Sequence, residues 1–147
     1  MPDILRHAEA SWEGDLRSGT GKASTGSGAL KDADVTFSSR FEDAAGSNPE
    51  ELLAAAHASC FSMQLSGLLT AQGTPPGEIR TKATLTLRKD ESGARITRMH
   101  LVTEGRVAGI EEAAFKAAAE KAKEICPVSA LLTPGLEAVT LDARLVA

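Results

Sequence analysis

Cysteine and aromatic residues are scarce in this sequence, and neither sign of charge dominates it. The 147 residues include two cysteines, one tryptophan, four phenylalanines and no tyrosine, and the net charge is −4. Without a lysine and arginine cluster interleaved with aromatics, we expect no nucleic-acid partner. The two cysteines and three histidines form no Cys-x-x-Cys or His-x-x-x-His pair, so we also expect no metal site and no bound cofactor.

The sequence also lacks a long uninterrupted apolar run. Residues 1–9 do not show the basic and apolar pattern of a secretion signal. The longest apolar stretch, residues 52–69, is interrupted by His57, Gln64 and Gly67, and we expect it to be buried in protein rather than in lipid. We therefore expect a cytoplasmic protein without membrane contact. Thiols stay reduced in that compartment, so a disulfide between Cys60 and Cys126 would be transient.

The order of turn signals and apolar patterns predicts a single α+β domain spanning residues 1–147, with mostly antiparallel strands. Alternation of apolar and polar residues is typical of half-buried strands and predicts them near residues 8–13, 35–41, 79–88 and 139–145. Arg40 lies near the end of the second of these. A strand returning from Ile96 shifts its apolar phase, which predicts a bulge near Thr97-Arg98.

Two helices are predicted between these strands. Ser47 or Asn48 can cap a helix that has Pro49 at its first position and runs to about Ala71. A second helix spans about residues 110–125 and ends before Pro127. Its predicted buried stripe is Ile110, Ala114, Ala118, Ala122 and Ile125. The first helix is apolar on most faces, which predicts a dimer that encloses two such helices between sheets.

The two cysteines lie in segments that favour thiol redox chemistry. Cys60 lies within the first predicted helix among small residues. Cys126 ends the second helix directly before Pro127. A thiol at the end of an element can be approached by a partner group, and two such thiols without a secretion signal indicate a redox pair.

Five short segments carry most of the functional information. They are Trp12-Glu13-Gly14, Arg40-Phe41, Asn48-Pro49-Glu50-Glu51-Leu52, Ala55-Ala56-His57-Ala58-Ser59-Cys60-Phe61 and Cys126-Pro127-Val128-Ser129. Together they resemble the OsmC/Ohr family of thiol peroxidases, and the two cysteine motifs at this separation are more specific than either alone. An Arg-Phe pair ahead of the long helix is more similar to the OsmC branch than to the Ohr branch.

The resemblance implies an intertwined homodimer with active sites at the subunit interface, which reduces organic hydroperoxides to alcohols in oxidative stress. It implies that Cys60 is the peroxidatic cysteine and Cys126 the resolving cysteine. Arg40 and Glu50 would form the ion pair that prepares Cys60. An external dithiol, of lipoyl type, would reduce the Cys60–Cys126 disulfide again.

Elementary chemistry agrees with these roles. Only a thiolate attacks a peroxide, and burial in a helix would raise the pKa of Cys60. Arg40 would oppose that rise while held by Glu50 in a bidentate pair. Ten residues of straight helix separate Glu50 from Cys60 by about 15 Å. We therefore expect Arg40 and Glu50 of one chain to serve Cys60 of the partner chain, with a bent helix as the alternative.

Each of these residues also has an ordinary structural explanation. Cys60 and Cys126 would be inert if they only fill the core. Arg40 would be a surface arginine on a strand, and Glu50 a residue that interacts with the helix dipole. Glu51 fits the same dipole role, and only the motif distinguishes the two glutamates.

Two further hypotheses stay open at this stage. His57 lies one turn before Cys60 and would tune the thiol or form a Cys–His pair, although a packed histidine is the simpler interpretation. An apolar funnel over Cys60 would hold bulky hydroperoxides, or would make the protein a non-catalytic dimeric carrier of small hydrophobic ligands. The expected lining residues are Phe41, Leu52, Leu53, Phe61 and Met63.

Overall fold

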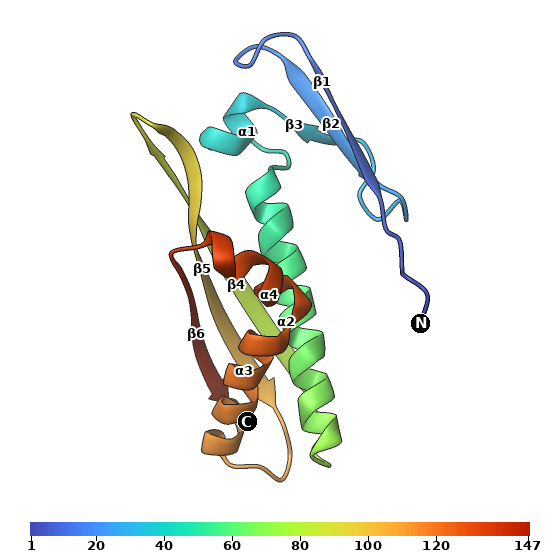
Figure 1. Cartoon of the computed structure of the whole chain (residues 1–147), viewed down its shortest axis with the longest axis vertical. Helices are drawn as coiled ribbons and strands as arrows, with labels where there is room; N and C mark the ends of the chain where they lie inside the picture. The colour runs from blue at the N-terminus through green and yellow to red at the C-terminus, as the bar shows by residue number, and fades with distance from the viewer. The chain divides into compact units, whose positions relative to one another are not determined.

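The computed structural model describes residues 1–147, which form two compact units, Met1–Leu52 and Leu53–Ala147 (Figure 1). The first unit holds β1 (Ala8–Glu13), β2 (Thr20–Thr25), β3 (Ala33–Val35), α1 (Phe37–Phe41) and the first turn of α2 (Pro49–Ala71). The second holds the rest of α2, β4 (Glu78–Asp90), β5 (Gly93–Arg106), α3 (Glu112–Ile125), α4 (Pro127–Leu132), the 3₁₀ turn η1 (Thr133–Gly135) and β6 (Ala138–Leu145). The predicted α+β class is confirmed, and the single-domain assignment stays a prediction.

The first unit contains an antiparallel sheet in the order β1-β2-β3. The predicted strand over residues 35–41 is wrong, because its extended part ends at Val35 and α1 follows. The Thr36 hydroxyl accepts a hydrogen bond from the Ser39 backbone N–H (3.0 Å), and the Ser39 hydroxyl accepts one from the Thr36 N–H (2.9 Å). This capping box starts a helix, so Arg40 lies on α1.

The start of α2 follows the prediction. The Asn48 side-chain oxygen accepts a hydrogen bond from the backbone N–H of Glu51 (2.7 Å), which satisfies one of the free donors at a helix start. Pro49 occupies the first helical position, where its missing N–H is not needed. Asn48, rather than Ser47, is therefore the cap.

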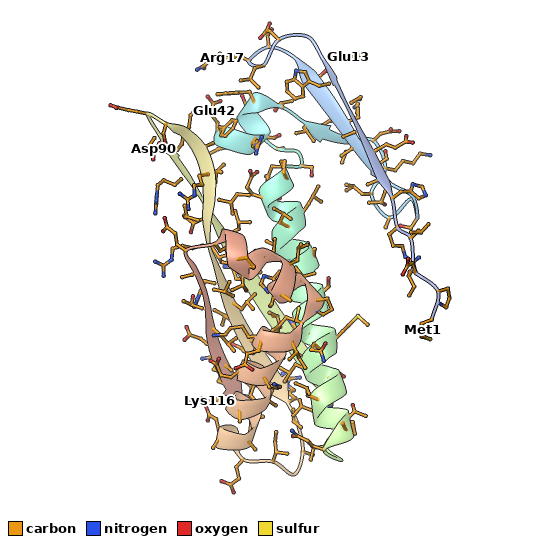
Figure 2. The ribbon with its side chains drawn as sticks, viewed as in Figure 1. Met1, Glu13, Arg17, Glu42, Asp90 and Lys116 are labelled. Atoms are coloured by element: carbon orange, nitrogen blue, oxygen red, sulfur yellow. The ribbon has the colours of Figure 1, made fainter.

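The second unit contains a mixed sheet in the order β4-β5-β6. β4 and β5 make a long antiparallel hairpin with Asp90 at its tip (Figure 2), and β6 pairs with β5 in parallel. Thr86 pairs with Arg98 and Leu87 with Ile96, which leaves Thr97 as an extra residue on β5. The bulge predicted near Thr97-Arg98 is confirmed.

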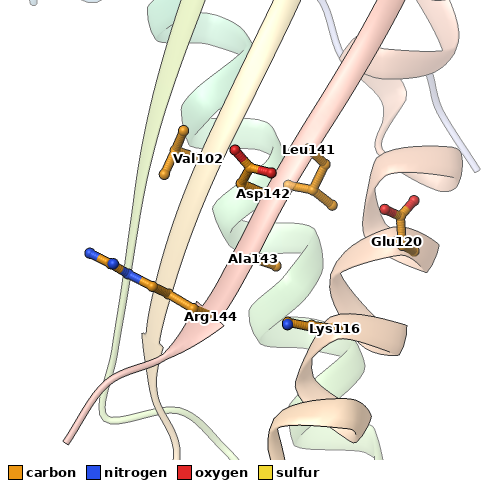
Figure 3. A pocket seen from close by; sticks show the side chains of 7 residues that line it. All are labelled: Val102, Lys116, Glu120, Leu141, Asp142, Ala143 and Arg144. Atoms are coloured by element: carbon orange, nitrogen blue, oxygen red, sulfur yellow. The ribbon is translucent and has the colours of Figure 1, made fainter.

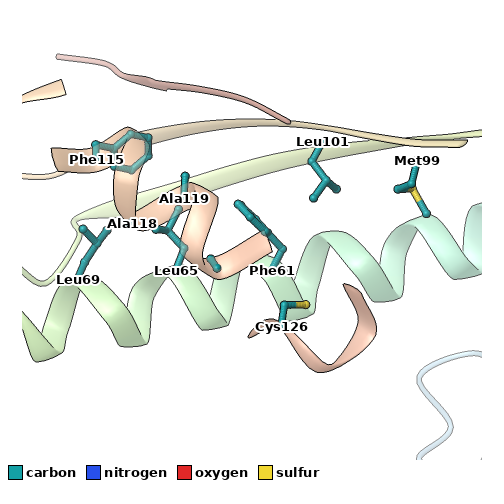
Figure 4. Close-up of a cluster of buried hydrophobic side chains, with 10 residues drawn as sticks. Phe61, Leu65, Leu69, Met99, Leu101, Phe115, Ala118, Ala119 and Cys126 are labelled. Carbon is teal, nitrogen blue, oxygen red and sulfur yellow. The ribbon is translucent and has the colours of Figure 1, made fainter. Parts of the chain in front are cut away.

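The core of the second unit lies where α2 and α3 meet the sheet (Figure 4). Phe61, Leu65 and Leu69 recur every four residues on α2 and are fully buried, as expected for one helical stripe. The ring of Phe115 on α3 lies over Gly105, where a Cβ atom would come within 2.4 Å of the ring. Gly105 therefore allows α3 to approach β5 closely.

The buried face of α3 differs from the predicted stripe. Its buried residues are Phe115, Ala118, Ala119 and Ala122, whereas Ala114 is exposed and Ile125 is 40% exposed. An alanine buries little apolar area, so alanines mark a face weakly, and one phenylalanine outweighs several of them. The position of Phe115 decides which face turns inward.

The face of α2 opposite the core stripe is exposed. It carries Ala55, Ala56, Ser59, Met63 and Gly67, and Met63 is 77% exposed. Length and composition alone make α2 a candidate membrane span, a property that it shares with core helices of globular proteins. Its other face packs on the sheet, so within the second unit α2 has one covered side and one exposed side.

Candidate active site

Cys126 occupies the corner between α3 and α4. Its backbone N–H donates to the carbonyl of Ala122, and its carbonyl accepts from the N–H of Ala130 (both 2.9 Å). Pro127 takes the first position of α4, which ends α3 and starts the next helix in a new direction. The Cys126 side chain is therefore held by one helix on each side.

Both cysteine side chains meet within the second unit. The Cys126 thiol donates a hydrogen bond to Cys60 Sγ at 2.9 Å, and both are free thiols. Cys126 is fully buried and Cys60 half-buried. A disulfide bond is about 2.05 Å long, so about 1 Å of movement would join the two sulfur atoms.

The surroundings of Cys60 in the second unit do not by themselves favour its thiolate form. Burial raises the pKa of the Cys60 thiol, and the Cys126 sulfur raises it further. The backbone N–H of Val128, in the first turn of α4, acts in the opposite direction. No positively charged group of the second unit lowers this pKa, so within that unit Cys60 favours the neutral thiol.

His57 is buried one turn before Cys60 and bonds to α4. Its Nε2 lies 2.6 Å from the Ser129 hydroxyl, both residues are fully buried, and Nδ1 is buried without a partner. This is the packed histidine of the simpler interpretation, and no hydrogen bond joins it to Cys60.

Burial lowers the pKa of His57 below its ordinary value, which predicts a pH dependence of stability. Below about pH 6.5 the unfolded chain protonates this histidine while the folded chain keeps it neutral. The free energy of unfolding should therefore be highest above that pH and fall as the pH drops through the lowered pKa. Urea unfolding at about pH 7.5 and about pH 5.5 checks this. Equal pH slopes for wild type and His57→Gln would contradict it.

Arg40 and Glu50 form an ion pair in the first unit. Arg40 Nε and Nη2 both donate to Glu50 Oε1, at 3.1 and 2.9 Å. The predicted double hydrogen bond is present, but its two donors share one oxygen, and Oε2 is buried without a partner. The Arg40 guanidinium also lies 5.1 Å from the centre of the Phe41 ring, and Glu51 is exposed. Glu50, not Glu51, is the partner of Arg40.

The four predicted site residues thus form two pairs, one in each unit. α2 continues without interruption from Glu50 to Cys60, a rise of about 15 Å. The partner chain and a bent helix both stay predictions for how the Arg40–Glu50 pair reaches Cys60.

Comparison with known proteins assigns the family. A model of OsmC-like protein matches residues 42–140. Peroxiredoxin OsmC of Escherichia coli (strain K12) is 44% identical over 142 residues, which is 97% of each chain. The chain belongs to the OsmC family. This agrees with the branch that the Arg40-Phe41 pair predicted.

Solved structures support the fold of this OsmC-family chain. An organic hydroperoxide resistance protein OsmC from Legionella pneumophila superposes with a TM-score of 0.72 at 24% identity, covering 97% of this chain and 99% of the other. The organic hydroperoxide resistance protein OhrB of Bacillus subtilis gives a TM-score of 0.71 at 24% identity, covering 94% and 98%.

Two residues of this site do not follow from the sequence patterns. The backbone N–H of Val128 lowers the pKa of Cys60, and the Ser129 hydroxyl lies 2.6 Å from His57 Nε2. The available signal is the Cys126-Pro127 pair, because a proline after a cap residue opens a helix and turns its first N–H groups toward the cap side. As the end of α3 alone, Pro127 does not predict α4.

An apolar pocket of about 400 Å³ lies in the second unit. It is lined by Leu53, Leu85, Ile96, Met99, Leu131, Leu132, Gly135 and Leu136. Leu53 and Cys60 are seven residues apart on α2 and share a face, so the pocket begins about 10 Å along the helix from Cys60.

The predicted funnel residues of the second unit do not line one pocket. Leu53 lines the pocket, whereas Phe61 is buried in the core and Met63 is exposed. Leu52 is 39% exposed, and Phe41 contacts Phe37 on α1.

A second hollow between β6 and α3 is lined by four charged side chains and by Val102, Leu141 and Ala143 (Figure 3). Lys116, Glu120, Asp142 and Arg144 surround it, and all four are exposed. Charged, water-exposed groups do not favour an apolar ligand. No group of three or more histidine, cysteine and acidic residues that could hold a metal ion occurs in the chain.

Proposed function

We propose that this chain is a cysteine-based antioxidant peroxidase that reduces organic hydroperoxides, with Cys60 as the peroxidatic and Cys126 as the resolving cysteine. The observation that carries the proposal is the 2.9 Å separation of the two free sulfurs. The 44% identical relative named Peroxiredoxin OsmC supports the peroxidase class.

The proposed reaction has two steps on the protein. The Cys60 thiolate attacks one peroxide oxygen and breaks the O–O bond, giving a sulfenic acid at Cys60 and an alkoxide that takes up a proton to become the alcohol. The Cys126 thiol then displaces water from the sulfenic acid and forms the disulfide. Two sulfurs already at 2.9 Å favour this second step because little reorientation is required.

Recycling requires an external dithiol, which we propose to be of lipoyl type. Its first thiolate must attack the more accessible sulfur. Cys126 is fully buried and Cys60 half-buried, so the mixed disulfide forms at Cys60 and Cys126 is released as the thiol. The second thiol of the reductant then displaces Cys60 and closes its own disulfide.

Arg40 supplies a cation for Cys60 in this proposal. Its guanidinium would stabilise the Cys60 thiolate and the departing alkoxide, and Glu50 orients it through two hydrogen bonds to Oε1. An arginine that holds Glu50 is tied to a point about 15 Å along α2 from Cys60. We therefore propose that the Arg40–Glu50 pair of one chain serves Cys60 of its partner.

A homodimer follows from the same proposal. The exposed face of α2, with Ala55, Ser59, Met63 and Gly67, presents small and apolar side chains over four turns. Burying such a face against a second copy removes apolar surface from water and lets the two backbones come close. We propose that the dimer works in the cytoplasm, where dithiol reductants keep both cysteines reduced.

Substrate preference provides the test of the proposed function. The apolar pocket that begins about 10 Å along α2 from Cys60 favours a hydroperoxide that carries a hydrocarbon group. Cumene hydroperoxide should therefore react at least about tenfold faster than hydrogen peroxide. The measurement is peroxide consumption by wild type with dihydrolipoamide as reductant. No consumption with any dithiol would reject the peroxidase and leave the dimeric carrier of small hydrophobic ligands, for which the same pocket is the binding site.

A further inference from the structure

The corner residue Cys126 and the first turn of α4 contact α2 through two hydrogen bonds. The Cys126 thiol donates to Cys60 Sγ at 2.9 Å. The Ser129 hydroxyl lies 2.6 Å from His57 Nε2. Between them, the backbone N–H of Val128 lowers the pKa of Cys60.

Only the second hydrogen bond avoids the reacting sulfurs. Formation of the Cys60–Cys126 disulfide consumes the thiol hydrogen bond, whereas neither partner of the His57–Ser129 bond takes part in the reaction. The His57–Ser129 bond is therefore the one that can keep α4 in place while the other changes.

Stability alone does not explain why the His57–Ser129 pair is buried here. Both side chains are fully buried, and His57 Nδ1 lacks a partner. A buried polar atom without a hydrogen bond costs free energy that an apolar residue of similar size would not cost. A directional bond between two helices does fix their register, because its length and angle tolerate little change.

We infer that His57 and Ser129 are a positioning pair, which holds the first turn of α4 so that Cys126 and the Val128 N–H stay directed at Cys60. The inference rests on the proposed two-cysteine function and adds residues to it. Neither residue touches the hydroperoxide; both act through the placement of Cys126 and Val128.

Two readouts separate positioning from general stability. The first is the rate of disulfide formation after one equivalent of cumene hydroperoxide, followed by rapid quench and mass measurement. The second is the equilibrium of the Cys60–Cys126 disulfide against glutathione, which reports the effective concentration of one thiol at the other. The second readout needs no peroxidase activity, so it tests the pair even if the proposed function fails.

Ser129→Ala and His57→Leu should each lower the rate of disulfide formation and the effective concentration of one thiol at the other by about tenfold or more. Without a fixed α4, the two thiols no longer stay in reacting positions. Ser129→Thr and His57→Gln keep a hydrogen-bonding group near the same place and should return both to within about threefold of wild type. Ser62→Ala is the matched control. It removes another hydroxyl bond of α2, to Thr81 Oγ1 at 2.8 Å, which does not reach α4.

Two results would overturn the inference. One is a folded Ser129→Ala variant that forms the disulfide at the wild-type rate and has the wild-type equilibrium against glutathione. The other is an equal loss in Ser62→Ala, which would attribute the effect to general loosening of α2. Far-ultraviolet circular dichroism on each variant establishes that it is folded before either readout is compared.

Discussion

Cys60→Ser should lose hydroperoxide reduction, with turnover at least about 1,000-fold below wild type. A serine hydroxyl is not ionised near neutral pH and cannot replace the thiolate as nucleophile. The fold should survive, because serine differs from cysteine by one atom and the position is half-buried. The measurement is consumption of cumene hydroperoxide with dihydrolipoamide in excess.

Cys126→Ser should behave differently and serves as the matched variant. It keeps the nucleophile, so it should consume one equivalent of hydroperoxide per subunit and then stall with Cys60 as a sulfenic acid. With excess hydroperoxide Cys60 should advance to the sulfinic acid, seen as a mass gain of two oxygen atoms. Continued turnover by Cys60→Ser, or wild-type turnover by Cys126→Ser, would contradict the two-cysteine reaction.

Arg40→Met should reduce the second-order rate of Cys60 oxidation by about 100-fold, the usual effect of removing a charge-stabilising donor. Within its own unit the pKa of Cys60 is raised by burial and by Cys126, and methionine cannot oppose that rise. Arg40→Lys keeps the charge but loses the planar double donor, so it should recover only part of the rate. Rates of sulfenic acid formation under single-turnover conditions, measured across pH, provide the check.

Mixed dimers decide which chain supplies Arg40. A dimer of one Arg40→Met chain and one Cys60→Ser chain contains one intact Cys60 and one intact Arg40, on different chains. If the arginine acts across the dimer, each mixed dimer should have one of its two sites restored, and complete exchange of a 1:1 mixture of the two impaired proteins should recover about a quarter of wild-type activity. Absence of recovery in exchanged dimers would place Arg40 and Cys60 of one site on the same chain.

Local patterns of sequence predicted much of the secondary structure. The Asn48-Pro49 start, the alternation along β4 and the phase shift at Thr97 each depend on neighbours within a few residues, and all three are present. The strand predicted at residues 35–41 failed for a local reason too, because Thr36 and Ser39 form a capping box and short apolar runs fit strand and helix alike.

The buried face of α3 and the parallel pairing of β6 required the tertiary structure. Alanines alone mark a helix face weakly, and the close approach of Phe115 to Gly105 joins residues of two elements. A terminal strand can pair on either edge and in either direction, and its direction depends on the preceding connection through α3 and α4.

For the site, sequence by itself determined the chemistry available: two thiols, an arginine, a glutamate and a buried-type histidine in motifs that resemble one family. Only the tertiary structure decided that Cys60 and Cys126, 66 residues apart, lie at 2.9 Å, and that His57 meets Ser129 across 72 residues. Such pairings depend on how helices pack on a sheet. That packing minimises exposed apolar area over the whole fold, so no local stretch of residues encodes it.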